Sequence, residues 1–376
     1  MIELSSEDSF RLNVLLANKP QAIRIDESRM SVHGLSAKGE LKVQLNPSGR
    51  PEQYIRLVRE LISGHILGSP GGYPTYLRRW TRMGQMRDES LEQLLMLGEP
   101  EAVVAAVCSP GLSDELARRA WWAMEDAENA RRMLNNPAIV AGQMGPVLAR
   151  YLIEYLPFET EAERMMESVR LVLQPGLIDE AARADLWKKS ARKQAYLVGF
   201  LRAVPDDLPE PMPARADAAA TLELVAQLAR DGNPAAALIL RVQSSPGQTF
   251  IRTVASVLAK PPSQEVVQHS LDLLRDYFAI LRPEGDPDLT LEVLEVEAEA
   301  FTAPDTAPAA VGECLQVAPA LAGDLRAMRV LSGLGYGVLR PFLRDSTAIG
   351  SLMRRTLKPV IDPVLGQLGV LVGGPR

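Results

Sequence analysis

One pattern of residues occurs twice in this chain. The segment Ser109–Trp122 reads SPGLSDELARRAWW and Gln174–Trp187 reads QPGLIDEAARADLW, so the frame PGLxDExARxxxW returns after 65 residues. Each copy follows an apolar segment with helical periodicity and opens a second helix. Repeated helix pairs predict a stacked α-hairpin (HEAT-like) array, in which each pair buries its apolar face against its neighbours. A plain helical bundle with one coincidental similarity is the alternative.

A different periodicity occupies the N-terminal part. Apolar and polar residues alternate there, which predicts three short strands at 22–26, 30–34 and 41–45. Because a small antiparallel sheet needs a cover on its apolar face, we expect the amphipathic helix at 52–63 to lie against it. The predicted fold is therefore mostly α, with a small N-terminal three-stranded antiparallel β-meander.

Proline-rich segments suggest where the chain divides. Residues 205–213 hold four prolines, which is typical of a semi-rigid linker. The composition predicts a small α/β N-terminal unit at 1–87, an α-helical repeat-like domain at 88–204, a Pro-rich linker at 205–216, a second helical region at 217–301, a linker at 302–322 and a basic, apolar C-terminal helical tail at 323–376.

Charge reverses sign near the C-terminus. Residues 284–305 carry eight acids and no base, whereas residues 323–376 carry eight bases and three acids. A basic, apolar helix can lie on an anionic membrane surface, dock on a partner protein, or dock on an acidic segment of its own chain. We expect internal or partner docking in preference to the membrane.

Composition narrows the class of protein. The net charge of −6 argues against broad nucleic-acid binding, which needs a basic surface. The N-terminus lacks the basic region of a signal peptide, and no apolar run approaches the ~20 residues that span a bilayer, so a soluble, cytoplasmic protein is expected. Cys108 and Cys314 are far apart and the three histidines are scattered, so we predict structural cysteines, no metal centre and no cofactor.

The stretch Gly64–Trp80, GHILGSPGGYPTYLRRW, raises the question of a ligand site. Its glycines could let backbone N–H groups converge on an anion. However, no strand precedes them and no Gly-Lys-Ser/Thr follows, so the segment fits neither a dinucleotide nor a Walker loop. Pro74 suits the first turn of a following helix, and a sharp turn between two helices accounts for the glycines.

The helix expected at 74–83 carries aromatic rings on one face and arginines largely on the other. Arginine with interleaved aromatics can bind RNA or a nucleotide, but the same residues also suit a protein contact. We favour a structural or protein-contact role. The predicted ligand or partner contacts are Gly71, Gly72, Tyr73, Tyr76, Arg78, Arg79, Trp80 and Arg82.

No catalytic set emerges from the sequence. The paired acids Asp114/Glu115 and Asp179/Glu180 directly follow Pro-Gly-Leu-x, where a helix begins, and acids there favour the helix dipole. No nucleophile elbow or Ser-His-Asp arrangement is present in the sequence, so we predict no catalytic residues.

Several long strings resemble one family. RLNVLLANKPQAIRIDESRM at 11–30, the run at 64–107, LARRAWWAMEDAENARRML at 116–134 and ESVRLVLQPGLIDEA at 167–181 look like the DsrS family, as does RVLSGLGYGVLRPFLRD at 329–345. These are soluble accessory proteins encoded with the reverse-acting dissimilatory sulfite reductase of sulfur-oxidising bacteria. The resemblance implies a cytoplasmic, supporting or regulatory part in sulfur oxidation. It brings no catalytic residues.

Three functions follow, in order of preference. The first is a non-catalytic adaptor or regulator of sulfur oxidation that acts through protein partners. The second is an RNA- or nucleotide-binding regulator that uses the Arg/aromatic helix. The third is an enzyme with an unrecognised site.

Overall fold

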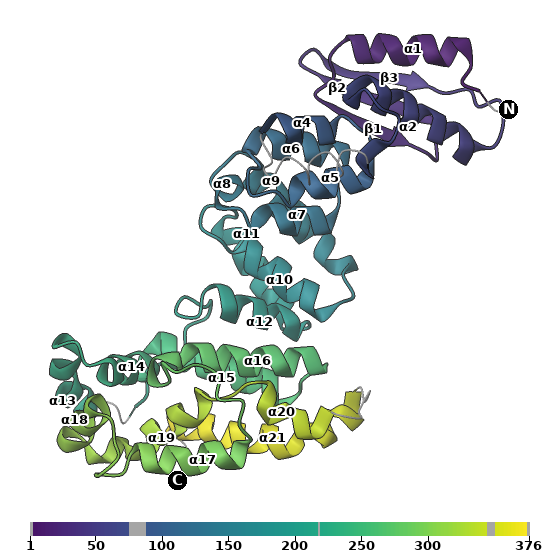
Figure 1. Cartoon of the computed structure of the whole chain (residues 1–376). Helices are drawn as coiled ribbons and strands as arrows, with labels where there is room; N and C mark the ends of the chain where they lie inside the picture. Colours follow the sequence, from purple (N-terminus) through teal and green to yellow (C-terminus); the bar gives the residue numbers. More distant parts are fainter. Residues whose placement is uncertain (1–2, 75–87, 217–218, 344–349, 374–376) are drawn as a thin grey trace. The chain divides into compact units, whose positions relative to one another are not determined.

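The computed structural model describes residues 3–74, 88–216, 219–343 and 350–373. Within these residues the chain is mostly α-helical, with one small antiparallel sheet near the N-terminus (Figure 1). The predicted fold class is therefore confirmed. The chain forms two compact units, one of residues 1–157 with 174–178 and the other of residues 158–173 with 179–376.

The N-terminal sheet is the predicted meander. Its strands are β1 (Ala22–Asp26), β2 (Ser31–Ser36) and β3 (Gly39–Gln44), paired antiparallel in the order β1-β2-β3. Val32 in the central strand lies opposite Ile25 on one side and Val43 on the other. The apolar residues of the three strands therefore share one face, as their alternation predicts.

Two helices cover that face, α1 (Ser6–Ala17) and α2 (Pro51–Leu67) (Figure 1). Side chains of both helices join the sheet in a single buried cluster of Leu12, Leu15, Leu16, Ile23, Val32, Val43, Leu45, Tyr54, Ile55, Val58 and Ile62. Gly34 allows α1 to approach β2 closely, because a Cβ there would lie 3.0 Å from Leu15 Cδ2. The expected helical cover at 52–63 is thus present, and α1 adds a second helix to it.

Short helices complete the first unit. They are α4 (Asp88–Leu95), α5 (Pro100–Val107), α6 (Asp114–Ala123), α7 (Ala127–Leu134), α8 (Pro137–Val140) and α9 (Met144–Tyr155), followed by the 3-10 turn η1 (Leu156–Phe158). Neighbours in sequence pack together, α5 on α6 and α7 on α9, while α4 and α6 also contact β1. The meander is therefore packed against the helices that follow it.

Both copies of the repeated frame begin helices. In the first copy Ser113 caps α6, its hydroxyl accepting from the amide of Leu116 at 3.3 Å. In the second, Asp179 caps α11 (Glu180–Ser190), its carboxylate accepting from the amide of Ala182 at 2.8 Å. Asp114 is the first residue of α6, as expected, and its two oxygens also accept from the amides of Gln143 and Met144 at the start of α9, at 3.0 Å each.

The second unit contains helices and no strand among its described residues. Besides α11 it contains α10 (Ala162–Val172), α12 (Gln194–Ala203), α13 (Ala219–Arg230), α14 (Pro234–Gln243), α15 (Ser245–Ala259), α16 (Gln264–Tyr277), η2 (Ala279–Leu281), α17 (Leu291–Phe301), α18 (Ala309–Val317), η3 (Pro319–Leu321), α19 (Ala322–Leu331), α20 (Tyr336–Leu343) and α21 (Gly350–Leu371). The pairs α10/α12, α13/α14 and α17/α19 pack closely.

The unit boundary differs from the predicted linker at 205–216. That segment lies inside the second unit and is held by long-range polar contacts. Arg215 pairs with buried Asp324 at 2.6 Å, and the amide of Met212 donates to Thr249 Oγ1 at 2.8 Å. These partners come from α19 and α15, so the segment is bound along the unit and is not a free spacer.

The predicted linker at 302–322 is also corrected. It contains α18 and η3, and Val311 and Cys314 of α18 are buried. Helix α18 packs on α13 and α14. The prolines before α18 suggested a linker in the sequence. However, Pro308 directly precedes the first residue of the helix, where proline does not interrupt helical hydrogen bonding.

The basic tail docks on the acidic segment of the same chain. Arg329 of α19 pairs with Glu284 at 2.6 Å and with Glu297, and Arg340 of α20 pairs with Asp288. The apolar side of the tail is buried within the second unit. Internal docking, one of the alternatives raised by the sequence, is therefore what the structure contains.

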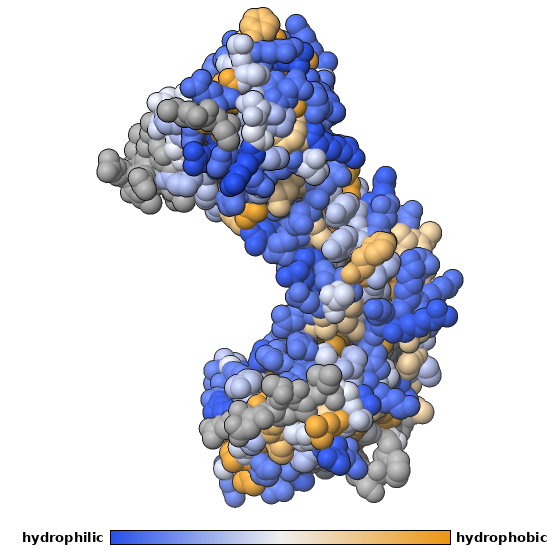
Figure 2. Space-filling view, turned by 90° about the vertical axis from the view of Figure 1, so that its right-hand side faces the viewer, coloured by the Kyte–Doolittle hydropathy of each residue, from blue (hydrophilic) through white to orange (hydrophobic). Residues whose placement is uncertain are grey.

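The face of the molecule drawn in Figure 2 is mainly hydrophilic, with separate hydrophobic patches. Among the described residues, the most exposed large apolar side chains are those of Phe158, Phe10 and Val296, at 74%, 69% and 69%. One hydrophobic patch lies at the top of the view in Figure 2, at the height of α1 in Figure 1. No helix in the described ranges is long and apolar enough to cross a membrane.

Candidate functional site

The glycine-rich turn after α2 is tied back onto that helix. Gly68 ends α2 in the left-handed conformation, with φ 65°. The hydroxyl of Ser63, buried in the last part of α2, donates to the carbonyl of Ser69 at 2.6 Å and accepts from the amide of Gly72 at 2.8 Å. Gly72 has φ 58°, which favours glycine. The turn is therefore a fixed structure with one of its amides already bonded.

A carboxylate of the protein occupies the space that an anion would take. Glu99, just before α5, accepts from the amide of Tyr73, with its Oε2 at 3.2 Å. A Cβ on Gly72 would lie 2.2 Å from Glu99 Oε1, so the glycine is needed for the carboxylate to approach. Burial raises the pKa of Glu99 above its usual value, and the Tyr73 amide partly offsets this effect. The turn thus receives an anion, but an internal one.

The other predicted contacts cannot be placed. Tyr76, Arg78, Arg79, Trp80 and Arg82 lie outside the described residues. Gly71 is exposed and Tyr73 is half-buried. The structure brings Gly72 and Tyr73 together with Glu99 and Ser63, two residues that the sequence did not single out. Nothing in the local sequence signals this pairing, since Glu99 reads as an ordinary acid beside a helix-starting proline.

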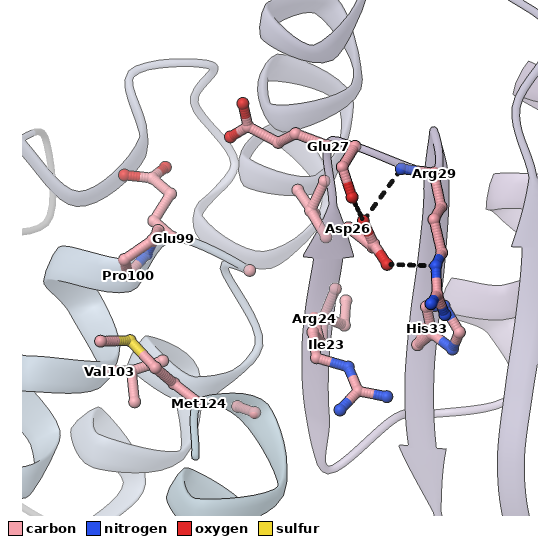
Figure 3. Close-up of a pocket in the computed structure, with 14 residues that line it drawn as sticks. Ile23, Arg24, Asp26, Glu27, Arg29, His33, Glu99, Pro100, Val103 and Met124 are labelled. Atoms are coloured by element: carbon pink, nitrogen blue, oxygen red, sulfur yellow. Dashed lines mark hydrogen bonds and ion pairs between the residues drawn. The ribbon is translucent and has the colours of Figure 1, made fainter. Parts of the chain in front are cut away.

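Next to Glu99 is a cavity of about 530 Å³ (Figure 3). One wall is β1 and the turn that follows it, up to Arg29, with His33 of β2. The opposite wall is the segment from Gly98 to Val103, with Ala123 and Met124 at the end of α6. Figure 3 shows the edge of β1 facing Pro100, Val103 and Met124 across the gap. This cavity, called the β1 cavity, is the candidate site.

The acids at the upper end of the β1 cavity are paired inside the protein. Asp26 accepts from Ser28 Oγ at 2.7 Å and from the amide of Arg29 at 3.0 Å (Figure 3). These bonds lower the pKa of Asp26, the one from Ser28 most. Glu27 forms an ion pair with Arg59 of α2. Neither carboxylate is placed as a free general base.

At the other end, the polar face of the sheet is joined to α6. The Arg24 guanidinium lies over the Trp122 ring, 4.9 Å from its centroid, and donates to the Trp122 carbonyl at 3.3 Å. Glu40 accepts from Trp122 Nε1 at 3.3 Å and contacts His33 Nδ1 at 2.5 Å. Although burial raises the pKa of Glu40, the bonds from His33 and Trp122 outweigh it and lower that pKa. This cluster holds the meander on the helices.

The backbone edge of β1 faces the β1 cavity. The amide of Leu45 donates to the Met30 carbonyl at 2.8 Å. Because residues of an antiparallel strand bond to a given neighbour at alternate positions, the even-numbered residues of β2 are the ones that bond to β3. Ser31, His33 and Leu35 therefore face β1, and Ile23 and Ile25 turn their N–H and C=O groups towards the cavity. Among the described residues, no hydrogen bond joins these groups to another element. Ile23 is fully buried and Ile25 is half-buried, so the accessible part of this strand edge is at Ile25.

The described ranges contain no group of three His, Cys, Asp or Glu residues arranged to hold a metal ion. A second cavity, of about 460 Å³ between α10, α12 and α16, contains charges of both signs, and its His269 lies 3.9 Å from Glu163. No protein-family model, curated protein or solved structure matches the chain.

Proposed function

We propose that this chain is a non-catalytic accessory or regulatory protein that acts through protein contacts in the cytoplasm. The observation that carries the proposal is the composition of the β1 cavity. Its acids are engaged by neighbouring residues, whereas the outward backbone groups of half-buried Ile25, on the edge of β1, have no described partner. A strand edge recognises the backbone of an extended chain, which is a property of peptides and not of small substrates. On the resemblance to the DsrS family, we further propose sulfur oxidation as the process it supports.

The turn at Gly71–Tyr73 fits this role as a support for the site. By holding Glu99 on the amide of Tyr73, it fixes the start of α5, which forms one wall of the β1 cavity. The same contact weakens the RNA or nucleotide alternative at this turn. A phosphate would have to displace Glu99 from Tyr73 and Ser63 from Gly72.

The test is recovery of a partner with a matched pair of variants of the full chain. Met124 lines the β1 cavity and is half-buried, and Met96 is half-buried in the same unit without lining it. Affinity isolation from cells of the source organism with wild type and Met96→Glu should recover the same stoichiometric protein, and Met124→Glu should lose it. Circular dichroism must show equal helix content in all three proteins.

Two outcomes would overturn the proposal. If no protein is recovered stoichiometrically with wild type, the adaptor role fails. If Met124→Glu and Met96→Glu recover the partner equally, the β1 cavity is not the contact. Recovery of a partner that is unrelated to sulfur oxidation would reject the proposed process while leaving the protein-binding role intact.

A further inference from the structure

A second open strand edge lies on the other side of the sheet, beside an apolar groove. The groove, of about 470 Å³, runs between α1 and β3. Its apolar lining includes Phe10, Val14 and Leu41, which are 69%, 46% and 38% exposed. Leu15 and Val43 form its buried floor. Three large apolar side chains thus surround one depression on an otherwise hydrophilic surface.

The backbone of β3 faces this groove with unused hydrogen-bonding groups. Because Leu41, Val43 and Leu45 bond to β2, Glu40, Lys42 and Gln44 turn their N–H and C=O groups outwards. Within the described part of the chain, no hydrogen bond from another element reaches these groups. All residues of β3 except Val43 are exposed. An open edge of this length, if left uncovered, is a template for another strand.

The ionisable residues that line the groove have one sign, and Glu40, the acid at the start of the edge, is already bonded to His33 and Trp122. Arg11 and Lys42 are the ionisable residues among those that line it. Arg11 also pairs with Glu7 on α1, at 2.5 Å, whereas no ion pair joins Lys42 to a described residue. Side chains alternate along β3, so Lys42 lies on the face opposite Leu41 and Val43. A strand added beside β3 would therefore meet apolar groups on one face and a cation on the other.

We propose that the α1–β3 groove binds an extended peptide that adds a fourth strand to the sheet. The peptide's apolar side chains, at alternate positions, contact Phe10, Val14 and Leu41, and a carboxylate between them lies across from Lys42. A helix beside an edge strand gives such a peptide both backbone bonds and side-chain pockets. At ~3.3 Å per residue, the edge from Glu40 to Gln44 matches a segment of about five residues.

A second copy of the chain suits the groove less well. The antiparallel register that pairs all of Glu40–Gln44 with its copy centres on Lys42 and places the two lysines directly opposite each other. Like charges in that position are destabilising. An acidic peptide turns the same position into an opposite-charge pair. The partner is therefore a heterologous acidic, apolar segment, and the site is separate from the β1 cavity.

The experiment uses full-length protein and two labelled six-residue peptides. One alternates isoleucine with aspartate and the other alternates isoleucine with lysine. Fluorescence anisotropy should show saturable binding of the aspartate peptide and at least about tenfold weaker binding of the lysine peptide. Hydrogen exchange should slow at β3 in the complex. Methylating the peptide amides that face β3 should abolish binding, and methylating the others should not.

Variants locate the site. Phe10→Ser and Lys42→Glu should each weaken binding of the aspartate peptide about tenfold or more. Phe158→Ser is the matched control, because Phe158 is equally exposed, at 74%, and lies far from β3 in sequence. Met124→Glu should bind the peptide like wild type, which separates this site from the β1 cavity. Equal binding of both peptides, equal loss in Phe158→Ser, or a wild-type dimer that Phe10→Ser dissociates would overturn the proposal.

Discussion

Two nearly buried arginines in the second unit allow one stability prediction to be worked out from the structure. The side chains of Arg282 and Arg329 are 2% and 8% exposed, and both donate to Glu297 of α17. Glu284 adds a second carboxylate for both arginines, at 3.4 Å from Arg282 and 2.6 Å from Arg329. Replacing Glu297 with glutamine keeps the shape but removes one of two negative charges facing two guanidinium groups.

The expected loss of stability follows from the cost of uncompensated buried charge. Removing one partner of a buried ion pair typically costs about 3–5 kcal/mol. Glu297 is 33% exposed and the glutamine carbonyl still accepts a hydrogen bond, so water and the amide compensate in part. We therefore expect Glu297→Gln to lower the free energy of unfolding of the second unit by about 2–3 kcal/mol at pH 7.

The contacts of Glu297 with the two arginines also predict that stability depends on pH. Burial raises the pKa of Glu297, but hydrogen bonds from Arg282 and Arg329 outweigh it, so that pKa is lowered in the folded protein. A lowered pKa contributes stability above the unfolded-state value, and this stability is lost as pH falls through the folded-state value. Because glutamine resembles the protonated acid, the gap between wild type and Glu297→Gln should narrow as pH falls through the carboxylate range.

Urea unfolding followed by circular dichroism measures these differences, and hydrogen exchange of amides in α17 and α19 locates them. Glu299→Gln, an exposed change on the same helix, is the control and should stay within about 0.5 kcal/mol of wild type. If Glu297→Gln is as stable as Glu299→Gln at pH 7, the arginines do not depend on Glu297 for compensation and the reasoning is wrong.

Three further predictions concern single residues. Gly72→Ala should lower stability by about 1–2 kcal/mol because Gly72 has a left-handed backbone. Gly64→Ala, at a position in α2 where a Cβ meets open space, should raise stability by about 0.5–1 kcal/mol. Thermal unfolding of the two variants should show shifts of opposite sign. Burial raises the pKa of the Cys314 thiol to about 11. A thiol reagent should therefore modify only exposed Cys108 in the native protein, and both cysteines in urea. Equal rates of modification of the two cysteines in the native protein would contradict this. Asp114→Ala should cost about 1 kcal/mol, with faster exchange of the first amides of α9; unchanged exchange there would refute its capping role.

Patterns within short segments predicted most of the fold. The alternation of apolar and polar residues at 22–45 correctly predicted three strands. One face of the sheet is buried, and successive side chains of a strand point to opposite faces, so the buried face appears in the sequence with a period of two. The PGLxDE frame located two helix starts, since a cap acts on amides a few residues away. It could not predict that Asp114 serves α9, because that bond spans 29 residues.

Segments held by distant residues were predicted wrongly. Proline content at 205–216 indicated a spacer, but Arg215 and Met212 find partners 109 and 37 residues away. The candidate site failed to appear in the sequence for the same reason. Glu99 fills the glycine turn from 26 residues away, and the open edges of β1 and β3 depend on which residues of β2 bond to each neighbour.

Another molecule can be bound where the charged or backbone groups of the protein do not already have a partner inside the chain. Part of the charge contrast between 284–305 and the basic tail is used in ion pairs inside the second unit, of Arg329 with Glu284 and Glu297 and of Arg340 with Asp288. At the sheet, by contrast, the groups without a described partner include the outward backbone groups of β3 and the side chain of Lys42. The two edges differ in selectivity: β1 faces a cavity whose acids are already paired, and β3 faces apolar side chains and Lys42. Sequence preference in a bound peptide should therefore come from β3, and Met124→Glu and Lys42→Glu should impair different interactions.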